Sequence, residues 1–197
     1  MYNLGLALCG GGSKGIAHAG VIKFLGEKNI VPDVLAGTSA GAIVATMYAA
    51  GKTPEEIVAF FKSVYFFKWN HFAFRKPGGF IQSDVFAKYL KPIFEDRKLE
   101  DLDKKVFVTA TNIITGKLEV FGGDVKVVDA VIASCAVPMV ATPYRIGNHL
   151  YSDGGILNNF PVDVLNYVSR KNIGVYFSQQ KSIEESSLKN LFDITAR

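Results

Sequence analysis

The pentapeptide Gly37-Thr38-Ser39-Ala40-Gly41 stands between an apolar segment with the pattern of a strand and a run of small apolar residues with the pattern of a helix. A strand that passes directly into a helix forces a cramped turn, so the positions two before and two after the serine require glycine or a residue close to it. Such a turn, a nucleophile elbow, directs the hydroxyl outward near the positive end of the helix. Ser39 is therefore the candidate nucleophile; the simpler alternative is a turn serine beside a buried helix.

The chain has 197 residues, of which 49% are hydrophobic, and this favours one domain over 1–197 with a single large core. The polar segment 179–197 is the one part expected to be flexible or to belong to a longer C-terminal region. The net charge is +4, but basic and acidic residues are interleaved, which argues against a nucleic-acid partner. Cys9 and Cys135 lack the spacing of a zinc site or a disulfide framework, so we expect no metal and a reducing compartment.

No apolar stretch is long enough to span a bilayer and the N-terminus lacks a basic region, so we expect a cytoplasmic protein without a signal peptide. The segment Tyr65-Lys76 mixes aromatic and basic side chains. Aromatic rings suit a lipid interface and cations suit anionic headgroups, which predicts peripheral membrane contact. An equally weighted alternative is a loop that packs its aromatic rings on the core.

Apolar periodicity predicts alternating strands and helices. The expected strands are 3–9, 31–36, 106–111, 117–121, 146–152 and 173–178, and the expected helices are 16–27, 40–50, one with a capping box at Thr53, one from Ser83 that Pro92 bends or ends, 127–136 and 161–169. In the first helix, Ala17, Val21, Phe24 and Leu25 are expected to face the core. This order predicts a three-layer α/β/α fold with a mostly parallel central sheet and functional groups at the carboxyl ends of the strands.

A glycine-rich loop, Gly10-Gly11-Gly12-Ser13-Lys14-Gly15, follows the first strand and opens the first helix. Its exposed amides can converge on an anion. A dinucleotide site is one interpretation, but that site needs an acidic residue at the end of the second strand, whereas Asp33 stands at its start. A Walker loop is excluded because Ile16 occupies the position of the lysine. The remaining interpretation is an oxyanion hole formed by the amides of Gly10, Gly11, Gly12 and Ser13.

A serine nucleophile needs a base. A conventional triad would combine Ser39 with Asp124 or Asp129 and with His149, which lies in a predicted hairpin tip. Asp153 is the better candidate, because it ends a strand and two glycines follow it, which leaves the carboxylate uncrowded. An ordinary Asp-Gly turn is the simpler explanation of the same residues.

Four motifs in this order resemble the patatin-like phospholipases, also called lipid acyl hydrolases. They are the glycine-rich loop, the pentapeptide around Ser39, Ala133-Ser134-Cys135-Ala136-Val137-Pro138, and Asp153-Gly154-Gly155. The resemblance covers nearly the whole chain. The family often carries arginine where Lys14 stands, so charge is kept here but forked hydrogen bonding is lost.

The resemblance implies a patatin-like catalytic domain in which Ser39 attacks a lipid ester and Asp153 accepts its proton, with no metal and no cofactor. It also implies that the glycine-rich loop holds the oxyanion and that water then releases the fatty acid. Supporting roles around the site fall to Lys14, Gly15, Gly37, Gly41, Ser134, Pro138, Gly154 and Gly155. A lipid-binding module without activity is a third alternative, but every group that the dyad requires is present.

Overall fold

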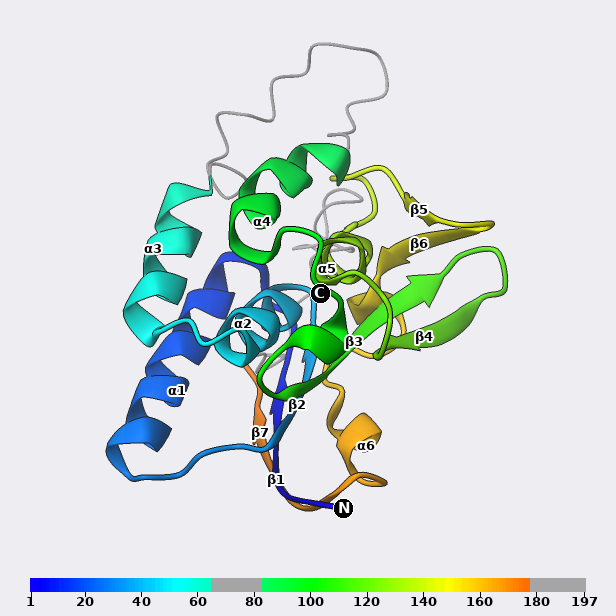
Figure 1. The fold of residues 1–197 in the computed structure, drawn as a ribbon. Coiled ribbons are helices and arrows are strands. Elements are labelled where there is room, and N and C mark those ends of the chain that lie inside the picture. Colours follow the sequence, from blue (N-terminus) through cyan, green and yellow to red (C-terminus); the bar gives the residue numbers. More distant parts are fainter. Residues whose placement is uncertain (65–82, 178–197) are drawn as a thin grey trace, which may run out of the picture.

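Strands and helices alternate along the chain, as the apolar periodicity predicts. The computed structural model describes residues 1–64 and 83–177 (Figure 1). The strands are β1 (Tyr2–Leu8), β2 (Val34–Thr38), β3 (Lys105–Asn112), β4 (Lys117–Phe121), β5 (Tyr144–Ile146), β6 (His149–Asp153) and β7 (Ser169–Val175). The α-helices are α1 (Ile16–Glu27), α2 (Ala40–Ala49), α3 (Pro54–Ser63), α4 (Ala87–Phe94), α5 (Val127–Ser134) and α6 (Val162–Leu165), and short 3₁₀ turns include η1 (Gly12–Gly15), η4 (Ser83–Phe86) and η6 (Gly154–Ile156).

One sheet contains all of these strands, in the order β5-β6-β3-β2-β1-β7 with β4 also paired to β3. β3, β2, β1 and β7 are parallel, whereas β4 and β6 run antiparallel to β3 and β5 runs antiparallel to β6. The predicted α/β fold with a mostly parallel central sheet is thus confirmed. The antiparallel strands gather at the β3 end of the sheet.

β2 and β6 lie end to end along the same edge of β3. β4 pairs with residues 108–112 of β3, and this range overlaps both the residues that pair with β2 and those that pair with β6. A strand has two edges, so β4 takes one and β2 and β6 share the other. The last β2 pair is Thr38 with Thr109, and the neighbouring β6 pair is Asp153 with Ala110. The carboxyl ends of β2 and β6 therefore meet.

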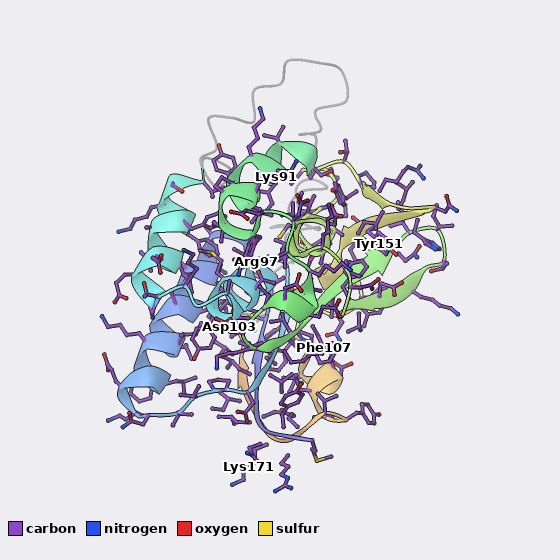
Figure 2. All side chains as sticks on the ribbon, viewed as in Figure 1. Lys91, Arg97, Asp103, Phe107, Tyr151 and Lys171 are labelled. Atoms are coloured by element: carbon purple, nitrogen blue, oxygen red, sulfur yellow. The ribbon has the colours of Figure 1, made fainter. Side chains whose placement is uncertain are left out.

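The two faces of the sheet are covered unequally. Helices α1 to α5 pack on one face around a large core that includes Leu6, Leu35 and Val108 (Figure 1). The other face has a small cluster in which Leu165 of α6 meets Ala7 and Ala36. Phe107 of β3 packs on that cluster (Figure 2). In the described residues, α6 is the one helix on this face.

The core-facing side of α1 differs in part from the prediction. His18, Ala19, Ile22 and Leu25 are the buried residues of α1, whereas Phe24 is 55% exposed. Leu25 is buried as predicted and Val21 packs on the core, but His18 also lies inside, because its Nε2 donates to the Cys9 carbonyl. α3 has the predicted capping box at Thr53, and it buries Ile57, Phe60 and Phe61, with Val64 buried just after its end.

Several boundaries also differ from the prediction. α4 continues through Pro92 to Phe94, so the proline neither ends nor interrupts it. The expected strand 146–152 is a hairpin of β5 and β6, α6 is much shorter than 161–169, and β7 begins at Ser169 rather than 173. The segments 65–76 and 179–197 lie outside the described residues. In residues 1–64 and 83–177, no helix is long and apolar enough to cross a membrane.

Candidate active site

Ser39 occupies the turn between β2 and α2 in a strained conformation. Its φ is 53° and its ψ is −120°, a region that residues other than glycine rarely adopt. The surrounding structure holds it there: its amide donates to Ser134 Oγ (2.7 Å), and its carbonyl accepts from the amides of Ala42 and Ile43. The residue is 8% exposed. The motif thus forms the cramped turn between a strand and a helix that its two glycines predict.

The two glycines of the pentapeptide are required by close packing. A Cβ on Gly41 would lie 2.1 Å from the Leu8 carbonyl oxygen, and a Cβ on Gly37 would lie 2.5 Å from the Gly41 carbonyl oxygen. Both obstacles are backbone atoms, which cannot move aside without displacing β1 or α2. β2 therefore passes into α2 directly against the end of β1.

The glycine-rich loop lies beside Ser39, because β1 and β2 are adjacent parallel strands. A Cβ on Gly10 would lie 3.3 Å from Ser39 Cβ. Gly12 has a φ of +56° and lines a cavity together with Ser39. Gly11 and Gly12 are exposed, and no acceptor for their amides is found among the described residues. These amides are therefore available to a ligand beside Ser39.

Gly10 differs from its neighbours in the loop. It is buried, and its amide donates to the Asn159 carbonyl at 3.0 Å. That hydrogen bond occupies the donor, so Gly10 anchors the loop and its amide does not face a ligand. The prediction that the Gly10 amide forms part of an oxyanion hole is therefore wrong.

His18 of α1 supports the loop from below. Its Nε2 donates to the Cys9 carbonyl (2.9 Å), and its ring packs on Phe177 with 4.2 Å between centroids. A Cβ on Gly11 would lie 3.3 Å from the same Phe177 ring. Burial lowers the pKa of His18 to about 4, so the imidazole is neutral at physiological pH.

Asp153 ends β6 on the same edge of β3 as Ser39. Its Oδ1 accepts from the Gly155 amide (2.7 Å), while Oδ2 has no hydrogen-bond partner of normal geometry in the described part of the chain. The Ser39 hydroxyl is still near enough to lower the pKa of the carboxyl. Asp153 thus has a buried acceptor oxygen without a partner in a carboxyl that the hydroxyl approaches, and hydrogen bonds of catalytic groups often shorten when a ligand binds.

Burial dominates the electrostatics of this carboxyl. Asp153 is 6% exposed, and desolvation raises its pKa to about 6, although the Ser39 hydroxyl and the Gly155 amide act in the opposite direction. A carboxylate with this pKa is a stronger base than an ordinary aspartate and is still ionised at pH 7.

The end of α5 and the residues that follow it connect Ser39 to Asp153. Ser134 Oγ accepts from the Ser39 amide, and the Ala136 carbonyl accepts both from the Asp153 amide (2.9 Å) and from Ser152 Oγ (2.7 Å). One short segment therefore fixes the backbone at both positions. Pro138, four residues after Ser134, is exposed.

A small cavity of about 40 Å³ opens beside Ser39. Besides Gly12 and Ser39, it is lined by Ala40, Ile43, Phe86, Cys135 and Val137. The lining is almost wholly apolar. The Cys135 thiol lies near the Ser39 hydroxyl and the Asp153 carboxyl. Its pKa is raised well above the ordinary value, chiefly by burial and then by the charge of Asp153. It is therefore not a reactive thiolate.

The other candidates for a base do not reach Ser39. His149 is exposed at the start of β6, four residues before Asp153, or about 13 Å along a strand. Its Nδ1 contacts Asn112 Nδ2 (3.2 Å), and Asp129 accepts from the Tyr144 hydroxyl (2.7 Å). Because His149 lies away from Ser39, the described residues contain no triad of Ser39 and His149 with either Asp124 or Asp129.

Asp33 has a structural role that does not fit a dinucleotide site. Its carboxylate accepts from the amides of Asn3 and Leu4 at the amino end of the sheet. This end is opposite to the one that carries the glycine-rich loop.

Sequence reasoning missed Asn159 and Phe86. The Asn159 side chain lies against Gly10 and Gly155, so it packs between the glycine-rich loop and the turn after Asp153. Phe86 reaches the cavity from η4. Neither residue lies in the four motifs, and only a three-dimensional arrangement brings them to the site.

Comparison with known proteins identifies the family. The family model "Patatin-like phospholipase" matches residues 6–166. The chain is 32% identical over 203 aligned residues to Patatin-like phospholipase domain-containing protein ZK370.4 of Caenorhabditis elegans, covering 96% of this chain and 14% of that protein. It is 30% identical to Uncharacterized NTE family protein Rv2565 of Mycobacterium tuberculosis, covering 83% and 28%. The chain thus spans less than a third of these two relatives.

Among solved structures, VipD from Legionella pneumophila has a similar fold. The TM-score is 0.64 at 19% sequence identity, and the match covers 80% of this chain and 46% of VipD. The order of the four motifs, the strained turn at Ser39 and the family match lead to one conclusion: the chain belongs to the patatin-like phospholipase family.

Proposed function

We propose that this protein is a serine lipid acyl hydrolase that cleaves fatty-acyl ester bonds of phospholipids or related lipids through a dyad of Ser39 and Asp153. The observation that supports the proposal is the meeting of β2 and β6 on one edge of β3, with the Ser39 hydroxyl near enough to the buried Asp153 carboxyl to lower its pKa. Family membership supports the reaction class, a lipid hydrolase.

In the first half-reaction, Ser39 Oγ attacks the ester carbonyl carbon while its proton passes to Asp153 Oδ2. The carbonyl oxygen becomes an oxyanion, and the exposed amides of Gly11 and Gly12 donate to it. Loss of one such donor typically costs about 3 kcal/mol of transition-state stabilisation. The tetrahedral intermediate then expels the alcohol, which takes the proton from Asp153 and leaves an acyl ester on Ser39.

In the second half-reaction, Asp153 accepts a proton from a water molecule, and the oxygen of that water attacks the acyl carbon. Collapse of this intermediate releases the fatty acid and returns a proton to Ser39 Oγ. A carboxylate is a weak base for a hydroxyl. The burial that raises the pKa of Asp153 to about 6 therefore favours both proton transfers.

The proposal is tested by hydrolysis of nitrophenyl butanoate and of phospholipid vesicles by the wild type and three variants. Ser39→Ala and Asp153→Asn should each lower kcat by at least about a thousandfold, as is typical when one member of a catalytic unit is lost. His149→Ala is the matched control and should retain activity. If Asp153→Asn stays active while His149→Ala does not, the dyad is wrong; circular dichroism verifies that each variant is folded.

Membrane contact through Tyr65-Lys76 stays a prediction. Replacing Phe66, Phe67 and Trp69 with polar residues should weaken binding to anionic vesicles while nitrophenyl butanoate is still cleaved. Equal loss of both would indicate misfolding rather than a membrane surface.

A further inference from the structure

The cavity beside Ser39 is separated from a second cavity by two side chains. Phe86 and Cys135 line the first cavity, and the same two residues line a second one of about 10 Å³. The remaining lining residues of the second cavity are Ser83, Ile132 and Ala141. Phe86 and Cys135 therefore stand between the space next to the nucleophile and the space beyond it.

Both cavities suit a hydrocarbon chain. Phe86, Ile132 and Ala141 are 3%, 1% and 4% exposed, so this region lies inside the apolar core. Ile132 belongs to α5, the helix that leads to Ser134. Of the lining residues, Ser39 and Ser83 alone carry hydroxyls, and the Ser83 hydroxyl already contacts Thr142 Oγ1. A polar headgroup would find few partners here, whereas methylene groups gain from burial.

The sizes of the two cavities restrict what enters. About 10–15 Å³ is the space that one water needs, so the first cavity holds a few water-sized groups and the second holds about one. An acyl group on Ser39 thus has room for its first few carbons before it meets Phe86. A longer chain needs the Phe86 ring to be smaller or to turn.

Phe86 is held by a helix rather than by a loose loop. It ends η4, and α4 follows at once with Leu90 and Phe94 fully buried. α4 packs on α5. Truncation of the Phe86 ring should therefore join the two cavities while the helix stays anchored.

We propose that Phe86 is a specificity-determining residue that limits the length of the acyl chain accepted by Ser39, with the second cavity as the site of the distal part of the chain. This inference rests on the proposed acyl hydrolase function. The wild type is then selective for short acyl chains over long ones.

The test measures kcat/KM for nitrophenyl esters from acetate to dodecanoate. Each buried methylene contributes about 0.8 kcal/mol, so joining the cavities in Phe86→Ala should raise the octanoate-to-butanoate ratio at least about tenfold. Phe121→Ala is the matched control: it removes a buried ring from β4, away from α4, lines neither cavity and should leave the ratio unchanged. Ala141→Leu, which narrows the second cavity, should cancel the gain when added to Phe86→Ala.

A second experiment measures covalent labelling of Ser39 by alkyl fluorophosphonates. Intact-mass spectrometry gives the rates of labelling by butyl and octyl fluorophosphonates, and Phe86→Ala should selectively accelerate the octyl probe. An unchanged ratio in Phe86→Ala, an equal rise in Phe121→Ala, or a gain that survives Ala141→Leu would each overturn the inference. If Phe86→Ala does not fold, the smaller truncation Phe86→Leu must raise the octanoate-to-butanoate ratio. No ester hydrolysis and no labelling of the folded wild type would overturn the proposed function and this inference together.

Discussion

The turn that carries Ser39 and the turn that carries Asp153 are built in different ways. The Ser39 turn is formed by residues that are consecutive in the chain: a parallel strand, a strained residue and a helix. Backbone atoms lie close to Gly37 and Gly41 on either side of Ser39. Asp153 ends an antiparallel strand that reaches β3 from far along the chain. The first position is set by sterics in its own segment, whereas the second depends on strand pairing and on the Ala136 carbonyl.

The largest effect should come from a methyl group placed in the Ser39 turn. Gly41→Ala puts a Cβ 2.1 Å from the Leu8 carbonyl oxygen, and we expect a loss of at least about 3 kcal/mol in the free energy of unfolding or no folded protein. In the Asp153 turn, a Cβ on Gly155 would meet the Asn159 and Asp153 side-chain oxygens at 2.9 Å, which can shift. Urea denaturation should show a smaller loss for Gly155→Ala; equal losses would contradict the comparison.

The second prediction concerns the cost of burying the Asp153 charge. The folded-state pKa of about 6 lies above the ordinary 3.8, so this carboxyl contributes stability below pH 4 and loses it as the pH rises through 6. Asp153→Asn does not titrate and should be more stable than the wild type at pH 8, by up to about 3 kcal/mol, with no such gain at pH 4.

Ser39→Ala is the matched control for this titration, because it removes the hydroxyl and leaves the carboxyl in place. Its stability relative to the wild type should change much less between pH 4 and pH 8. If the gain of Asp153→Asn does not vary with pH in thermal or urea denaturation, burial does not raise the pKa of Asp153.

The smallest losses of stability should come from replacing the serine that supports each turn, Ser134 for the Ser39 turn and Ser152 for the Asp153 turn. Ser134→Ala leaves the buried Ser39 amide without its acceptor and should cost about 1–3 kcal/mol of stability. Ser152→Ala also removes a 2.7 Å hydrogen bond, but the Ala136 carbonyl keeps the Asp153 amide, so about 1 kcal/mol or less is expected. A larger loss for Ser152→Ala would show that the Asp153 turn is the more dependent on one side chain.

The same contrast explains what could be predicted from the sequence. The bounds of α1, the capping box of α3 and the turn at Ser39 follow from local periodicity and sterics, and the structure matches them. The meeting of Asp153 with Ser39 required the pairing of β6 with β3, which periodicity does not encode; the resemblance to a family suggested it. Local reasoning also misplaced part of the buried face of α1, because burial of His18 depends on Cys9 and Phe177.

Phe86 and Asn159 illustrate the same limit within the site. Each reaches it from a segment whose sequence has no recognised motif, and the contacts that matter are with residues distant in the chain. The occupied amide of Gly10 is similar, since its acceptor, the Asn159 carbonyl, belongs to the turn after Asp153. Amide positions in a glycine-rich loop can be recognised from sequence, but their hydrogen-bond partners cannot.

The central claim, that Asp153 is the base for Ser39, is tested most directly by the pH dependence of Ser39 labelling with a small fluorophosphonate. In the wild type, the rate should be constant above about pH 7 and fall tenfold per pH unit well below about 6, as the carboxylate becomes protonated. In Asp153→Asn the rate should be low and should lack this ionisation, while His149→Ala should follow the wild type. An unchanged profile in Asp153→Asn, or its loss in His149→Ala, would contradict the account.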